Sequence, residues 1–211
     1  MAEAIGILGG TFDPVHFGHV RPALDVVEQL GLSHLHLIPN AVPPHRPQPI
    51  ATSQQRLMML HLAVKNTPQL IVDDREIQRE GESYTVDTLL SLRQDYPDNP
   101  LYLLMGSDAF IHIQTWHRWQ EILPLAHIVV MQRPDEDEAM SEQLTEWYTE
   151  NLAQTDDQQN VSGKIWPIEV TQLTLSSTDI RAKMSQGLTP HFLIPDSVIQ
   201  LIEQLKLYQT E

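Results

Sequence analysis

Two histidines three residues apart, His16 and His19, follow a short apolar run and a pair of glycines. The glycines at 9–10 let the backbone pass close to a ligand, and Asp13-Pro14 predicts a turn. The histidines then lie one turn apart at the start of a predicted helix, where unpaired N–H groups and a partial positive charge favour an anion. Because imidazoles can donate hydrogen bonds to phosphate oxygens, the segment 9–19 predicts a phosphate-binding loop.

Other interpretations of this loop are weaker. It lacks the six-residue glycine pattern of hydride-transfer enzymes and the terminal Gly-Lys-Ser/Thr of a P-loop. Histidines that only cap or pack a helix are the simple alternative, although the preceding Gly-Gly-Thr-Phe favours phosphate. Zinc held by His16, His19 and His45 is disfavoured, because their spacing fits neither a helical i, i+4 pair nor a motif with a nearby acidic ligand.

A second group of anion-binding residues lies nearer the C-terminus. Ser176, Ser177 and Thr178 place hydroxyls and free N–H groups at the start of a predicted helix, with Arg181 one turn further on. This pattern predicts a second cradle for phosphates.

Asp108 is a candidate for contact with a sugar. It follows Gly106 at the end of a predicted strand, where a carboxylate can accept hydrogen bonds from ribose hydroxyls. The alternative is an N-cap for the residues from Ala109 on, and both roles can hold at once.

Short apolar runs alternate with segments of helical period, and these elements must position the candidate residues. Strands are predicted at 4–8, 34–39, 70–72, 101–105, 127–131 and 164–170. Helices are predicted at about 18–30, 52–64, 85–92, shortly after Thr178, and at about 196–207. Repeated strand–helix–strand order with fully apolar strands predicts an α/β fold, a Rossmann-like doubly wound parallel sheet with helices on both faces. Its ligands are expected beyond the carboxyl ends of the strands.

Start signals support three of these helices. Thr52 with Gln55 three residues later predicts a capping box, Thr85 can cap the next helix, and Pro195 marks the start of the last. The stretch 135–159 is acidic, and we interpret it as a surface excursion. Its apolar residues could line one side of a helix: Met140, Leu144, Trp147 and Tyr148.

Composition excludes several classes of protein. The 211 residues carry 13 Lys and Arg against 28 Asp and Glu, a net charge of −15, which disfavours binding to a nucleic-acid polymer or an anionic membrane. A hydrophobic content of 41% predicts a folded protein. The length of 211 residues suits one large domain or two small ones, and we favour one domain over 1–211, with a helical C-terminal part from about 178. The chain has no cysteine, no signal peptide and no apolar run that could span a bilayer, so we expect a cytoplasmic protein.

Four motifs together resemble a known family. The segment 9–19, with its H-x-G-H ending, resembles the signature of the nucleotidyltransferase superfamily, and its long form Gly-Gly-Thr-Phe-Asp-Pro-x-His-x-Gly-His resembles the nicotinate mononucleotide adenylyltransferases. The loop 40–46, the segment 106–108 with Trp116, and the segment 175–181 are similar to further motifs of that family. Their order and spacing agree, and the resemblance covers nearly the whole chain.

The resemblance implies that nicotinate mononucleotide and ATP give nicotinate adenine dinucleotide and pyrophosphate, a step of NAD biosynthesis, by in-line attack without a covalent intermediate. It implies Mg²⁺ carried by the ATP phosphates, with no dedicated metal site. The implied catalytic residues are His16, His19, Arg46 and Arg181. The implied ATP-binding residues are Gly9, Gly10, Thr11, Phe12, Gly106, Asp108, Ser177 and Thr178. The implied residues for the mononucleotide are Asn40, His45, Tyr84, Thr85, Trp116 and Arg133.

Some of these residues have a structural alternative. Trp116 would stack on the pyridine ring or would only anchor the core, whereas Trp119 is expected to pack. Arg133 would hold the nicotinate carboxylate or would neutralise nearby acid. The sequence departs from the family pattern in the acidic stretch 135–159 and at His117, where an aromatic residue would make a better ring face.

Two other functions are alternatives. One is a sibling adenylyltransferase, acting on nicotinamide mononucleotide or phosphopantetheine, and the other is a nucleotide sensor without turnover. Intact His16, His19 and Arg181 argue against the sensor. The oligomeric state is not predicted.

Overall fold

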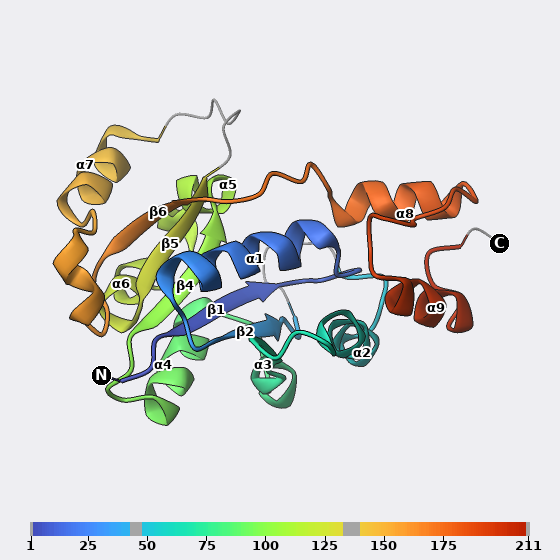
Figure 1. Cartoon of the computed structure of the whole chain (residues 1–211), viewed down its shortest axis with the longest axis horizontal. Coiled ribbons are helices and arrows are strands. Elements are labelled where there is room, and N and C mark those ends of the chain that lie inside the picture. Colours follow the sequence, from blue (N-terminus) through green and yellow to red (C-terminus); the bar gives the residue numbers. More distant parts are fainter. Residues whose placement is uncertain (1, 43–47, 133–139, 210–211) are drawn as a thin grey trace.

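Six parallel strands form one sheet in the order β3-β2-β1-β4-β5-β6 (Figure 1). The computed structural model describes residues 2–42, 48–132 and 140–209. The strands are β1 Ile5–Gly10, β2 His34–Pro39, β3 Leu70–Val72, β4 Leu101–Gly106, β5 His127–Gln132 and β6 Ile165–Glu169. This order reverses direction between β1 and β4, as in a doubly wound Rossmann-like sheet, so the predicted fold class is confirmed.

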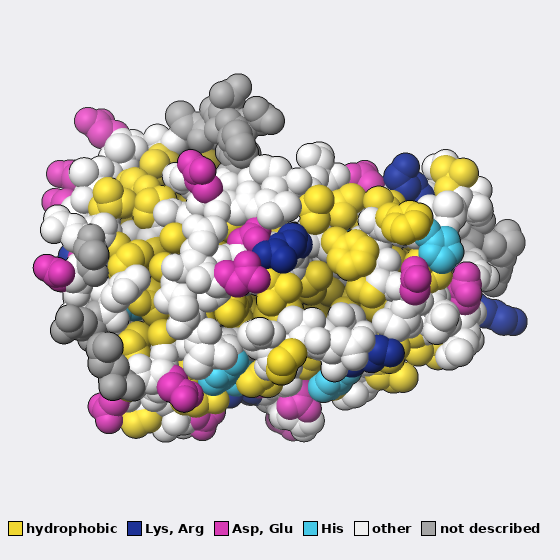
Figure 2. All heavy atoms as spheres, in the orientation of Figure 1, with side chains coloured by type: hydrophobic (Ala, Val, Ile, Leu, Met, Phe, Trp, Pro, Cys, Tyr) yellow, Lys and Arg dark blue, Asp and Glu magenta, His cyan; other side chains and the backbone are white. Residues whose placement is uncertain are grey.

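Helices connect successive strands and follow the last one. They are α1 Phe17–Leu30, α2 Ser53–Val64, α3 Arg75–Gln78, α4 Thr85–Asp95, α5 Ser107–Ile111, α6 Ile122–Leu125, α7 Glu142–Glu150, α8 Ser177–Ser185 and α9 Asp196–Gln204. Within the described ranges, none is long and apolar enough to cross a membrane. Acidic side chains are scattered over the face shown in Figure 2 rather than gathered in one patch.

The two faces of the sheet bury separate hydrophobic clusters, because side chains alternate along each strand. Leu35 and Leu37 of β2 point into a first cluster, which also holds the apolar stripes of α1, α2 and α9. Ile5 and Ile7 of β1 point into a second cluster, with residues of α4, α5, α6 and α7. Figure 1 shows α1 lying across one face of the sheet. The prediction of helices on both faces is therefore confirmed.

Helix starts follow the sequence signals in part. The capping box of α2 is confirmed, since Gln55 N donates to Thr52 Oγ1 at 3.3 Å and Thr52 N donates to Gln55 Oε1 at 2.8 Å. The prediction that Thr85 is an N-cap is wrong, because α4 already begins at Thr85 and the extended residue before it is Tyr84. Asp108 is likewise not an N-cap, since Gly106 precedes α5 and Asp108 lies in its first turn.

The acidic stretch includes a helix whose apolar stripe packs on the protein, as the sequence suggested. Residues 142–150 form α7, and Leu144 is fully buried in the second cluster. The Trp147 ring stacks near Phe110 and meets Trp119 edge-on, at centroid distances of 6.2 and 5.2 Å. The apolar stripe predicted for this segment thus attaches the helix to the sheet, and Trp119 has its expected packing role.

Candidate active site

The predicted phosphate-binding loop lies where the strand order of the sheet reverses. Gly9 and Gly10 end β1, the Asp13–Pro14 peptide is a cis turn, and α1 begins at Phe17. Beside β1, strand β4 ends at Gly106 and runs into α5. Because ligands of doubly wound sheets bind at this switch point, the predicted loop occupies the expected position.

His16 and His19 are held together by the helix start. His16 is the N-cap of α1, and its backbone N–H donates to Nδ1 of His19 at 3.2 Å. The two rings are stacked, with centroids 3.7 Å apart and an interplanar angle of 27°. Because Nδ1 of His19 accepts a hydrogen bond, its neutral ring carries the proton on Nε2. An imidazole N–H of this kind has the chemistry to donate to a phosphate oxygen.

Gly18 is required by close packing around this pair. A Cβ at position 18 would lie 3.0 Å from Nδ1 of His16 and 3.3 Å from Cβ of Leu175. The segment before α8 therefore packs directly on the His-x-Gly-His turn, and a side chain at position 18 would push them apart.

Phe12 packs against His19 from within the protein core. Its side chain is 1% exposed, its backbone is left-handed at φ 53°, and its ring meets His19 edge-on at 5.0 Å. A buried ring cannot reach a nucleotide, so the predicted contact of Phe12 with ATP can come only from its backbone.

Asp13 is a buried junction that the sequence signals missed. Its carboxylate accepts from the backbone N–H groups of Ile50 and Ala51 at 2.9 and 3.1 Å and from the Tyr208 hydroxyl at 2.6 Å. Nη1 of Arg181 lies 3.7 Å from Oδ2. The turn before His16 is therefore tied to the start of α2, to α8 and to the C-terminal segment.

Arg56 is a second buried junction. It is 1% exposed and donates to the carbonyl oxygens of Thr11, Asn40 and Ala51 at 2.7, 2.6 and 3.3 Å. Burial lowers the pKa of Arg56, while the charge of Asp13 opposes the shift. An arginine on the buried side of a predicted helix was the only signal in the sequence for this role.

The second phosphate cradle lies against the first. Ser176 caps α8 by accepting from Asp179 N at 3.0 Å, and the Ser177 hydroxyl donates to the Pro14 carbonyl at 3.0 Å. Arg181 donates to the Asp13 carbonyl at 2.7 Å. The structure thus brings together two predicted anion sites that lie far apart in the sequence.

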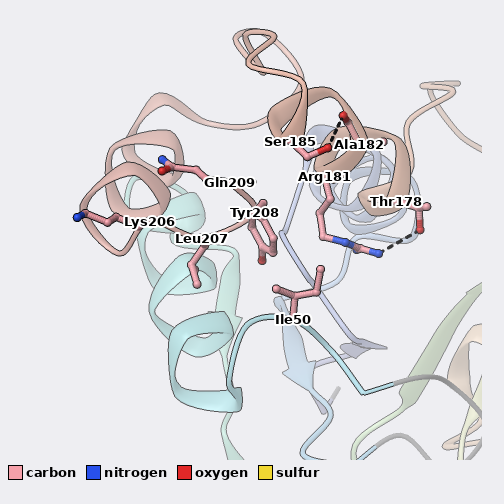
Figure 3. A pocket seen from close by; sticks show the side chains of 9 residues that line it. All are labelled: Ile50, Thr178, Arg181, Ala182, Ser185, Lys206, Leu207, Tyr208 and Gln209. Carbon is pink, nitrogen blue, oxygen red and sulfur yellow. Dashed lines mark hydrogen bonds between the residues drawn. The ribbon is translucent and has the colours of Figure 1, made fainter. Parts of the chain in front are cut away.

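A hollow of about 500 Å³ separates α8 from the C-terminal segment (Figure 3). Arg181 and Tyr208 project toward each other across it, above Ile50. Its remaining lining residues are Thr178, Ala182, Ser185, Lys206, Leu207 and Gln209.

Other predicted contacts lie at the carboxyl ends of β2 and β4. Asn40 follows β2, and its Oδ1 is buried without a hydrogen-bond partner among the described residues. An unsatisfied amide oxygen favours a role in binding substrate. Asp108 is exposed, and a Cβ at Gly106 would lie 2.3 Å from its Oδ1. Glycine at 106 therefore leaves the room that this carboxylate occupies.

The loop after α5 meets the start of α4. The rings of Tyr84 and His117 lie 4.3 Å apart, and Nη1 of Arg118 lies 3.3 Å from Oδ1 of Asp87. Trp116 is half-buried and packs against the second cluster. The structure thus places Tyr84 and Thr85 beside the loop that carries Trp116. His117, which the sequence analysis treated as a departure from the family pattern, is the ring partner of Tyr84.

Three predicted residues cannot be placed. Arg46 and His45 precede α2, Arg133 follows β5, and all three lie outside the described residues. Their roles stay predictions, as does the zinc alternative that needs His45.

A doubly wound sheet with a His-x-Gly-His helix start at its switch point defines a nucleotidyltransferase. In agreement, residues 7–183 match the model of the cytidylyltransferase-like family. Two relatives are each named "Probable nicotinate-nucleotide adenylyltransferase". The one from Methylococcus capsulatus is 47% identical, over 97% of this chain and 99% of its own, and the one from Aeromonas salmonicida is 43% identical, over 98% of both chains. The chain belongs to the nicotinate-nucleotide adenylyltransferase family.

A solved structure with a divergent sequence has the same fold. The nicotinic acid mononucleotide adenylyltransferase of Plasmodium falciparum, complexed with NaAD, superposes with a TM-score of 0.75 over 98% of this chain and 97% of that one. Its sequence is only 18% identical, so this likeness supports the architecture alone.

Proposed function

We propose that the chain transfers AMP from ATP to nicotinate mononucleotide, giving nicotinate adenine dinucleotide and pyrophosphate in NAD biosynthesis. One observation carries the proposal: the His16–His19 helix start and the N-terminus of α8 lie together at the switch point of the sheet. Two adjoining anion sites suit a reaction that aligns a triphosphate with a second phosphate. The names of relatives that are 43–47% identical over nearly the full length supply the second substrate.

The chemistry needs alignment and charge stabilisation rather than a protein nucleophile. The mononucleotide phosphate attacks the α-phosphorus in line while pyrophosphate leaves. Nε2–H of His19 donates to the charge that develops on the phosphates, and His16 is stacked beside it. Arg181 adds positive charge from α8, and Asn40 offers to the mononucleotide its Oδ1, which is buried and has no partner among the described residues.

We propose that Mg²⁺ enters with ATP as part of the substrate. Magnesium keeps several waters and binds substrate phosphates, where it neutralises their charge. In the part of the chain that the structure describes, no three His, Asp or Glu side chains form a group that could hold a metal. Removing Mg²⁺ with a chelator is expected to abolish product formation, and adding it back in excess to restore it.

The direct test is product formation by the pure protein with ATP and Mg²⁺. Nicotinate mononucleotide, nicotinamide mononucleotide and phosphopantetheine are offered separately, and pyrophosphate and the adenylylated product are measured. We expect turnover with nicotinate mononucleotide and a strong preference for it. Preference for another acceptor would assign the chain to a sibling activity, and tight ATP binding without any product would indicate a sensor.

Replacing Trp116 with alanine tests the pyridine site. Loss of stacking is expected to weaken binding of the mononucleotide by roughly 1 to 3 kcal/mol, which raises its KM about 5- to 150-fold. The matched control is Trp119→Ala, because Trp119 packs on Trp147 and should mainly lower the melting temperature. An unchanged KM in Trp116→Ala, with a large loss of thermal stability, would instead make Trp116 a packing residue.

A further inference from the structure

Tyr208 touches the active-site loop from the opposite end of the chain. It lies four residues beyond the end of α9, is 6% exposed, and donates its hydroxyl hydrogen to Oδ1 of Asp13 at 2.6 Å. Burial and the neighbouring Asp13 carboxylate raise the pKa of Tyr208, so the hydroxyl stays protonated and remains a donor near neutral pH. A charge-assisted hydrogen bond in a buried place is among the stronger contacts of this kind.

The segment that carries Tyr208 has two residues in an energetically unfavourable backbone conformation. Lys206 and Tyr208 are left-handed, at φ 52° and 60°, although neither is glycine. Such conformations persist when the surroundings determine them. Here Leu207 N donates to the carbonyl of Ile202 at 3.0 Å, and the ring of Tyr208 is buried in the first hydrophobic cluster. The segment is therefore docked in one defined position.

Asp13 connects Tyr208 to the residues that are proposed to bind the phosphates. Its carboxylate binds Tyr208 and the start of α2, while its carbonyl accepts from Arg181. His16 follows three residues later and stacks on His19. A shift of Asp13 would therefore move both histidines and Arg181 relative to each other.

We propose that Tyr208 is a positioning residue, which acts through Asp13 to hold His16, His19 and Arg181 in the geometry for transfer. This inference rests on the proposed function for its kinetic consequence. Tyr208 touches no reacting atom, and its hydroxyl acts only by orienting the Asp13 carboxylate. The C-terminal segment is thereby part of the active site's support.

Tyr208→Phe tests the proposal because it removes one hydroxyl and keeps the ring. We expect kcat to fall about 10-fold or more while the KM for the mononucleotide changes less than about twofold, since small misplacements of catalytic groups act mainly on turnover. Tyr102→Phe is the matched control. Tyr102 is buried in the same cluster, on β4, and its hydroxyl is not among the donors to Asp13. Its kcat is expected to be that of the wild type.

Hydrogen–deuterium exchange of backbone amides 11–19 provides a readout independent of the reaction. Tyr208→Phe is expected to speed exchange there about 10-fold, and Tyr102→Phe to leave it unchanged. Wild-type kcat in Tyr208→Phe, or unchanged exchange in this segment, would overturn the proposal. If the wild-type protein forms no dinucleotide, the proposed function fails, and the exchange rates still decide whether Tyr208 holds the loop.

The route through Asp13 is tested with a double variant. In an Asp13→Asn background, Tyr208→Phe is expected to lower kcat by less than about twofold further, because the two residues act through one contact. A full additional 10-fold loss would show that Tyr208 acts by another route and would overturn the assignment to Asp13.

Discussion

Replacing His19 with asparagine is expected to lower kcat by about 10² to 10³, the usual cost of one lost charge-stabilising donor. The amide oxygen of asparagine can take the place of Nδ1 and accept from His16 N, so the start of α1 is retained. What asparagine lacks is the N–H at the position of Nε2. The variant therefore separates the phosphate contact from the structural role, and it should melt close to the wild-type temperature.

Two companion variants complete this experiment. His19→Ala removes the cap as well as the donor, so it should lose the same factor in kcat and also melt at a lower temperature. His61→Asn is the matched control, because His61 is exposed on α2 outside the site. Wild-type turnover in a folded His19→Asn protein would exclude His19 from charge stabilisation.

Replacing Arg56 with methionine is expected to lower the free energy of unfolding by about 3 kcal/mol, since it leaves buried polar groups without their donors. The carbonyl oxygens of Thr11, Asn40 and Ala51 lose their hydrogen bonds in a place that water reaches poorly. Chemical denaturation at fixed pH measures the change. Because Arg56 also holds the loops after β1 and β2, the KM for the mononucleotide should rise as well.

Arg93→Met is the matched control for this prediction. Arg93 also donates to backbone carbonyls, to that of Asn99 just before β4 at 2.8 Å and to that of Leu125 just before β5 at 2.5 Å. Those carbonyls lie near the amino-terminal edge of the sheet, away from the switch point. Arg93→Met should therefore lower stability without changing KM. An Arg56→Met protein with wild-type stability would show that its carbonyls find other donors.

Strand positions and the fold class could be predicted from the sequence because a parallel sheet has a strong local signature. The central strands are short apolar runs, and β4, Leu101–Gly106, has both of its faces buried. Helix starts were less predictable. Thr85 and Asp108 have the side chains of N-caps, but the chain turns into the helix one or two residues earlier, at Tyr84 and Gly106. Tertiary context overrides such local preferences.

The residues of the candidate active site also fall into two groups, those that the sequence predicts and those that it does not. His16, His19 and Ser176 were found from sequence because a helix start needs its capping and anion-binding groups within a few residues. Asp13, Arg56 and Tyr208 were missed. Asp13 was noticed only as half of a turn, and nothing near it in the sequence marks it as a junction.

The sequence by itself determined the doubly wound sheet, the two helix starts that are predicted to bind phosphate, and the family to which the chain belongs. Only the tertiary structure decided how these parts are held together. The partners of the buried charges are distant in the chain: Thr11 lies 45 residues from Arg56, and Tyr208 lies 195 residues from Asp13. Local sequence patterns record contacts within a few residues, whereas buried hydrogen bonds across such separations arise only when packed layers bring the groups together.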